Sequence, residues 1–74
     1  MVNRYTILKS IPNINKLYLL GILPIHLMDW TVIYEYYLDE RKCLGKMQSY
    51  SNTADNYNLS ENHIMNIVYW MERL

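Results

Sequence analysis

The scarcity of turn-forming residues constrains the fold of this chain more than any other feature. Only two glycines and two prolines occur among its 74 residues. A β fold of this size needs many tight turns, which draw on these residues, so the sequence favours helices with few connections. A chain this short buries only about 60–65% of its unfolded surface and forms one domain with a thin core. We therefore expect an all-α fold, a small bundle of about four helices.

The charge balance limits the classes of partner. Seven Lys and Arg residues cancel seven Asp and Glu residues, and 51% of the residues are hydrophobic. This composition is typical of a globular protein, and its neutrality disfavours strong nonspecific attachment to nucleic acid or to an anionic membrane. The longest apolar run, residues 17–23, is far shorter than the roughly 20 residues of a membrane span, so no membrane partner is expected.

Cys43 is the single cysteine and has no partner for an internal disulfide. This pattern, without a signal peptide, predicts a protein of a reducing compartment, the cytoplasm. The sequence contains no phosphate-binding loop, no Cys/His metal set and no serine nucleophile with an assignable base. We expect no enzymatic activity, no cofactor and no metal site. His26 lies on an apolar helix face and is predicted to be a partly buried, hydrogen-bonded residue rather than a ligand.

The chain divides into an N-terminal arm, residues 1–12, and a helical domain, residues 13–74. The arm ends at Pro12, which restrains the preceding residue to extended geometry, and it is predicted to be extended or partly ordered. A first helix is expected over residues 13–23, where Asn13 can cap the start with its side chain. Its apolar residues Ile14, Leu17 and Leu20 lie three apart on one face.

Two longer helices are predicted next, over residues 25–42 and 46–57. The expected core faces follow a spacing of three and four residues. They are His26, Trp30, Ile33 and Tyr37 in the first, and Met47, Tyr50, Ala54 and Tyr57 in the second.

The last helix is predicted to run from Ser60, a good N-cap, to about residue 73. Asn58 can end the helix before it, because asparagine tolerates the left-handed backbone conformation. The clearest periodicity in the chain marks the core face of this last helix: Ile64, Ile67, Val68 and Met71.

Residues 52–68, NTADNYNLSENHIMNIV, resemble the helix-turn-helix of small bacterial and phage DNA-binding proteins. Ala54 is the small residue needed where two helices cross steeply, and Asn58 stands where the family usually has glycine. Leu59 is expected to point inward and plug the space between the helices. The resemblance places a helix-turn-helix at about residues 46–73, a third of the chain, and implies a transcriptional regulator that binds double-stranded DNA.

The resemblance further implies that the second helix of the motif lies in the major groove. Its exposed side chains are the candidates for base contacts: Glu61, Asn62, His63 and Asn66. Asparagine pairs bidentately with adenine, and histidine can donate to guanine. The candidates for phosphate contacts are Arg41, Lys42, Lys46 and Ser60.

The motif departs from a typical DNA-binding protein in its charge. The recognition helix has no Lys or Arg before Arg73, although phosphate neutralisation normally supplies much of the affinity. A monomer would then bind weakly, which favours a homodimer or a protein partner. Adjacent residues on a helix diverge by about 100°, so Tyr69 and Trp70 cannot both face the core. With Leu74, they form the predicted interface. The alternative function is a helical protein-interaction module that shares the fold and does not bind DNA.

Overall fold

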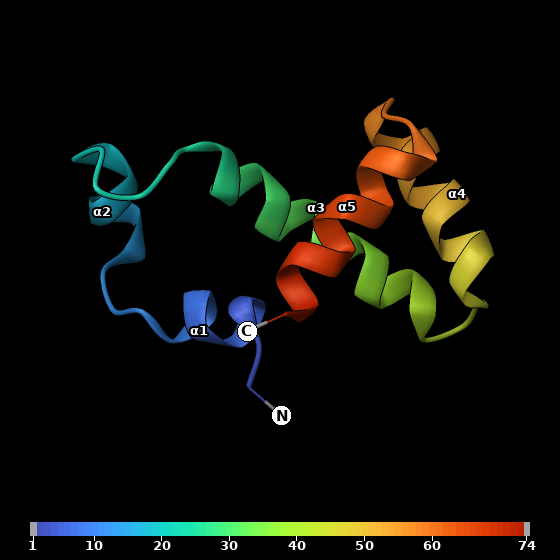
Figure 1. Cartoon of the computed structure of the whole chain (residues 1–74), viewed down its shortest axis with the longest axis horizontal. Helices are drawn as coiled ribbons and strands as arrows, with labels where there is room; N and C mark the ends of the chain where they lie inside the picture. The colour runs from blue at the N-terminus through green and yellow to red at the C-terminus, as the bar shows by residue number, and fades with distance from the viewer. Residues whose placement is uncertain (1, 74) are drawn as a thin grey trace.

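The computed structural model describes residues 2–73, and every regular element in that range is an α-helix. The five helices are α1 (Arg4–Ser10), α2 (Ile14–Leu19), α3 (His26–Arg41), α4 (Lys46–Tyr57) and α5 (Glu61–Glu72). The predicted all-α fold is confirmed. Figure 1 shows α3 running through the middle of the molecule, with α5 crossing it and α4 beside them at one end. At the other end, α2 projects away from these three helices.

The core is built where α3, α4 and α5 meet. On α5, the predicted face is confirmed, because all four of its apolar residues are completely buried. On α3, Ile33 and Tyr37 are buried as predicted, together with Leu27 and Tyr34. His26 is exposed, so its predicted burial was wrong, and its ring packs edge-on against Trp30 at 5.2 Å between centroids.

The core face of α4 differs from the prediction. Met47 is 67% exposed, and Ser49 and Thr53 are buried instead, beside Tyr50 and Ala54. Both hydroxyls donate to backbone carbonyls four residues earlier, at 2.9 and 2.7 Å. Because these bonds satisfy the hydroxyls within the helix, α4 can bury small polar residues and bring its backbone close to its neighbours.

The N-terminal arm is not extended, because residues 4–10 form α1. Asn3 caps this helix by accepting a hydrogen bond from the amide of Thr6, whose hydroxyl in turn bonds the backbone of Asn3. The amide of Arg4 donates to the carbonyl of Arg73 at 2.8 Å, so the two ends of the described chain lie side by side (Figure 1). This capping box satisfies backbone groups at the start of α1 and favours a helix over the extended arm that was predicted.

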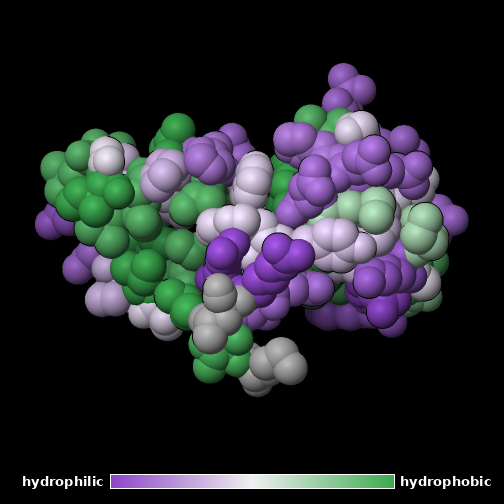
Figure 2. Space-filling view, in the orientation of Figure 1, coloured by the Kyte–Doolittle hydropathy of each residue, from purple (hydrophilic) through white to green (hydrophobic). Residues whose placement is uncertain are grey.

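The first predicted helix is shorter than expected, since α2 ends at Leu19. Asn13 does not cap it with its side chain; it adopts a left-handed conformation with φ of 57°. Leu20, expected on the core face, is 72% exposed. We call the exposed side chains of this part of the molecule the apolar end: Leu19, Leu20, Ile22, Ile25 and Val32. Figure 2 shows hydrophobic residues gathered over α2, and mostly hydrophilic ones over α4 and α5.

Candidate nucleic-acid interface

A three-residue turn, residues 58–60, joins α4 to α5. Asn58 has φ of 57°, as predicted, and its amide donates to the carbonyl of Asp55. The amide of Leu59 donates to the carbonyl of Ala54 at 3.0 Å. These two bonds form a Schellman motif, which satisfies the last carbonyls of a helix. The turn therefore fixes the direction in which the chain leaves α4.

The start of α5 is capped as predicted, because the Ser60 Oγ accepts a hydrogen bond from the amide of His63 at 3.1 Å. Ala54 is buried where α4 meets its neighbours. Leu59 does not plug the space between the helices; it is 36% exposed and lines a shallow cleft with Tyr57 and Val32. Since Ile64 and Ile67 fill the space between the helices, Leu59 is left at its edge.

The outward face of α5 follows from its buried face. Ile64 and Ile67 point into the core, and successive residues turn by about 100°, so Asn62, Asn66 and Tyr69 lie on the opposite side. All three are exposed. Two amides and a phenol therefore follow one another along the solvent face of the helix.

The two other candidates for base contacts lie beside this face. Glu61 is exposed in the first turn of α5. His63 is exposed as well, but its ring is turned toward α3, 6.4 Å from the ring centre of Trp30. The structure thus brings Asn62 and Asn66 onto one face and places Glu61 and His63 on its flanks.

Three of the phosphate candidates lie near the connection between α3 and α4. Arg41, Lys42 and Lys46 are all exposed. Arg41 donates to the carbonyl of Leu44, and Lys42 lies 3.2 Å from the carboxylate of Asp39 in an exposed ion pair. Ion pairs of this kind are weak and exchange readily with other partners. All three cations therefore remain accessible to an anion.

Lys46 connects this basic cluster to α5. Its ammonium group lies 5.9 Å from the ring centre of Tyr69, over the C-terminal half of α5. Ser60 lies at the other end of α4, roughly 18 Å away for a helix of 12 residues. The structure therefore separates Ser60 from the other three phosphate candidates by the length of α4.

The predicted interface residues have different surroundings. Tyr69 is exposed, as expected of one member of the pair. Trp70 is half-buried, with the Arg4 guanidinium over its ring at 4.5 Å and Trp30 edge-on at 5.6 Å. Leu74 lies outside the described residues. Much of the Trp70 ring is thus covered by its own domain. The spacing of residues could not reveal these contacts, because Arg4 and Trp30 come from distant elements.

Two tyrosines, the half-buried Tyr5 and the buried Tyr34, attach α1 and α3 to their neighbours. The Tyr5 hydroxyl donates to Glu35 at 2.8 Å; burial, with this bond, raises the pKa of Tyr5 to about 12. The Tyr34 hydroxyl donates to Glu72 at 3.0 Å. Burial, with the bond to Glu72, also raises the pKa of Tyr34. The neutral phenols and their carboxylate partners thus link α1 to α3 and α3 to α5.

Other kinds of site find little support in the described part of the chain. Among residues 2–73, no three His, Cys, Asp or Glu side chains are grouped so that they could hold a metal ion. No helix in the same range combines the length and the hydrophobicity needed to cross a membrane.

The comparisons with known proteins add no assignment. No family model, no curated protein and no solved structure matches this chain.

Proposed function

We propose that this chain is a small cytoplasmic DNA-binding protein that reads duplex DNA with α5 and regulates transcription. The observation that carries the proposal is the outward face of α5. Its opposite face is completely buried, which fixes the helix on the domain, while Asn62 and Asn66 are exposed toward solvent. A rigid helix with planar amides along its free side is suited to reading base edges in the major groove.

The spacing of the two amides fits the spacing of bases. Asn62 and Asn66 are four residues apart, which is about 6 Å along a helix axis. Base pairs are stacked about 3.4 Å apart, so the two side chains reach bases about two steps apart. Each amide can bond the N6 and N7 atoms of adenine, which makes a site with A·T pairs the preferred target. Tyr69, one turn further, can donate its hydroxyl to a phosphate oxygen.

The basic cluster supplies the phosphate contacts in this proposal. Arg41, Lys42 and Lys46 would hold one strand beside the C-terminal half of α5. The Ser60 Oγ accepts a bond from its own helix, so its hydroxyl hydrogen is still free to bond a phosphate at the other end. With about three to four phosphate contacts, log K should fall with log salt at a slope of only about −3.

A fluorescence anisotropy titration tests the proposal. The purified chain is titrated into labelled duplexes, one rich in A·T pairs and one rich in G·C pairs, over a salt series. We expect binding that weakens with salt and favours the A·T-rich duplex. Asn62→Ala should weaken binding to the preferred duplex by about 5- to 150-fold, the cost of one bidentate contact.

Two variants make the titration specific. Asn56→Ala is the matched control, since Asn56 is an exposed asparagine of α4 outside the proposed interface, and it should bind as the wild type does. Lys46→Ala should weaken binding to both duplexes alike, because a phosphate contact carries no sequence information. Absence of binding to either duplex at low salt would reject the proposal.

The second candidate function is a protein-interaction module that does not bind DNA. The charge of the α4–α5 region favours it, because Lys46 and Arg73 are outnumbered by Asp55, Glu61 and Glu72. Exposed Asp55 and Glu61 flank the turn before α5 and would repel a phosphate backbone. In the same titration, this candidate predicts no binding to duplex DNA at any salt concentration.

A further inference from the structure

Within residues 2–73, the side chains of the apolar end are left largely uncovered. Five of the seven large apolar side chains that are more than half exposed in residues 2–73 belong to it, Leu19 being the most exposed at 85%. The other two, Val2 and Met47, lie on other segments. Soluble monomers seldom expose several such side chains next to one another, and a contiguous patch marks an interaction site.

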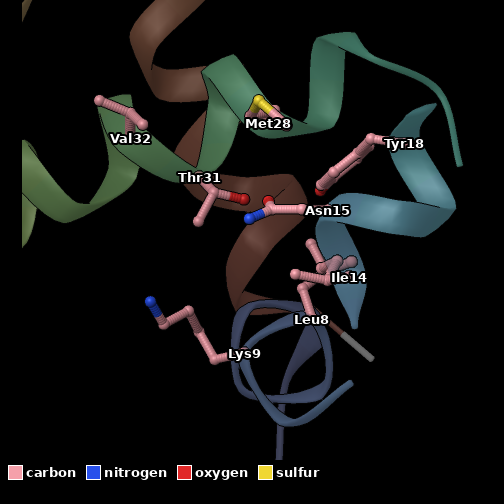
Figure 3. A pocket seen from close by; sticks show the side chains of 8 residues that line it. All are labelled: Leu8, Lys9, Ile14, Asn15, Tyr18, Met28, Thr31 and Val32. Atoms are coloured by element: carbon pink, nitrogen blue, oxygen red, sulfur yellow. The ribbon is translucent and has the colours of Figure 1, made fainter. Parts of the chain in front are cut away.

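The helix at this end, α2, contributes Leu19 to the surface and buries little of its own. Its six residues are too few to be stable as an isolated helix, and only Tyr18 among them is buried. An open cleft of about 190 Å³ separates α2 from α1 and α3, with Ile14 and Tyr18 on one side and Met28 and Val32 on the other. Figure 3 shows Asn15 extending across this cleft toward Thr31. A partner that covers this region would bury both the outer side chains and the open cleft.

The charge pattern indicates what that partner is. Residues 17–28 contain no Asp, Glu, Lys or Arg, and Lys16 is the single charged residue of α2, so two copies can face each other with little repulsion between like charges. A lipid surface is less suitable, because binding to anionic lipids draws on a cationic rim. Lys16 is the one cation on α2. The nearby Lys9 is paired with Glu35 at 3.1 Å, and Asp29 adds a negative charge at the edge, so these residues do not form a rim of several cations.

The size of the surface also fits self-association. A stable dimer buries about 800 Å² on each copy, which is about a sixth of the 5109 Å² surface of this chain. Residues 14–28 amount to about a fifth of the chain and form one whole end of the molecule (Figure 1). We propose that this chain forms a symmetric homodimer through the apolar end, with α2 and the α2–α3 connection of each copy packed against those of the other.

In such a dimer the two α5 helices lie away from the contact, because α2 is at the opposite end of the molecule from the α4–α5 turn (Figure 1). Pairing therefore leaves the proposed DNA-reading faces free. It also doubles the number of phosphate contacts, which a chain with few cations needs. The dimer does not rest on DNA binding, since its evidence comes from a different part of the surface.

Sedimentation velocity without DNA tests the dimer, over a concentration series from micromolar to millimolar. The wild type should shift from 9.0 kDa to twice that mass. Leu20→Glu should raise the dissociation constant by at least about a hundredfold, because a charge would be buried in the contact. Met47→Glu is the matched control, since Met47 is exposed to a similar degree on α4, and it should dimerise as the wild type does.

Three results would overturn the proposal. The first is a wild type that stays monomeric at millimolar concentration, including one that instead co-sediments with vesicles of phosphatidylcholine and phosphatidylserine. The second is a dimer that survives Leu20→Glu but is lost in Tyr69→Ala, which would place the contact at the C-terminal helix. The third is a set of concentration-dependent amide shifts in NMR spectra that leaves residues 14–28 unaffected. Circular dichroism verifies that each variant remains folded.

The same proteins separate this proposal from the DNA-binding one. A monomeric wild type that binds duplex DNA would remove the dimer alone. A dimer that ignores DNA would remove the DNA-binding function alone. If both proposals hold, Leu20→Glu should also weaken binding to DNA.

Discussion

The helices at the two ends of this molecule finish in the same kind of turn, but they are buried to very different extents. After α2, the amides of Gly21 and Ile22 bond the carbonyls of Tyr18 and Leu17, and Gly21 has a positive φ. After α4, Asn58 and Leu59 repeat this pattern. Both turns are Schellman motifs. Local turn geometry therefore does not decide which helix becomes part of the core.

What differs is the number of neighbours that a helix face meets. The apolar face of α5 packs on α3 and α4 and also meets α1, and its four apolar residues are completely buried. α2 lies beside an open cleft that separates it from α1 and α3, and it buries Tyr18 while Leu19 is exposed. The periodicity of apolar residues therefore predicts a core face only where the helix is long enough to be enclosed by other helices.

Removing a core side chain at each end should give the largest contrast. Ile67→Ala is expected to lower the free energy of unfolding by about 2–5 kcal/mol, because it leaves a cavity in a packed region. Leu20→Ala should change it by less than about 0.5 kcal/mol, since Leu20 is already exposed. Urea denaturation at low protein concentration measures both. Similar losses for the two variants would show that α2 belongs to the same packed unit as α5.

Raising the pH above 10 should lower the stability of the fold through its tyrosines. The pKa of Tyr5 is raised to about 12 from 10.0, and burial raises the pKa of Tyr34 and Tyr37 as well. Above pH 10 the unfolded chain releases these protons first, so the stability present below pH 10 is lost as pH rises toward 12. Urea denaturation across this range should show the decline, and Tyr5→Phe should make it shallower. A free energy of unfolding that stays constant up to pH 12 would contradict the raised pKa values of these tyrosines.

Two asparagines with a left-handed backbone conformation, one at each end, allow the same substitution to be compared in both regions. Asn13 and Asn58 share a φ of 57°, a conformation that alanine adopts at a cost of about 1–2 kcal/mol. Asn58→Ala should lower global stability by about 1 kcal/mol, because the turn belongs to the packed unit. Asn13→Ala should mainly speed amide exchange in α2. Urea denaturation and hydrogen exchange distinguish these effects. Equal losses of unfolding free energy for the two variants would contradict the difference between the two ends.

Replacing Tyr34 or Tyr50 by phenylalanine should change the free energy of unfolding least, and the two changes should differ in sign. Tyr34→Phe removes the hydrogen bond to Glu72 and should cost about 0.5–1.5 kcal/mol. The hydroxyl of Tyr50 is buried and, although the Tyr37 ring stacks on the Tyr50 ring at 5.2 Å, it makes no hydrogen bond of acceptable geometry among the described residues. Tyr50→Phe should therefore be neutral or stabilising, since it removes an unsatisfied polar group. A loss for Tyr50→Phe as large as that for Tyr34→Phe would reveal a bond that the structure does not contain.

The sequence predicted the elements whose signals are local. The bounds of α4, the left-handed Asn58, the cap at Ser60 and the buried face of α5 all depend on residues within one or two turns of each other. The buried hydroxyl face of α4 was missed because Ser49 and Thr53 are polar in composition and become compatible with the core only through their bonds to the helix backbone.

The contacts between distant elements could not be predicted. Trp70 lies under Arg4 because the amide of Arg4 bonds the end of α5 and anchors α1 there. A periodicity of three and four residues shows which residues share a face but not which neighbour covers it. For the same reason, Ile14, Leu17 and Leu20 were expected to share one face, although in the structure α2 projects from the molecule and leaves Leu20 exposed. The one signal that pointed to α1 was Asn3 followed by Thr6, the pattern of a capping box.

The central claim is that the outward face of α5 contacts duplex DNA, and amide chemical shifts test it most directly. A ¹⁵N-labelled sample is titrated at low salt with an unlabelled A·T-rich duplex. We expect the largest shifts at Asn62, Asn66 and Tyr69, including the side-chain amides of the two asparagines, and smaller shifts at Lys46. Spectra that do not change, or shifts confined to residues 14–28, would contradict this claim.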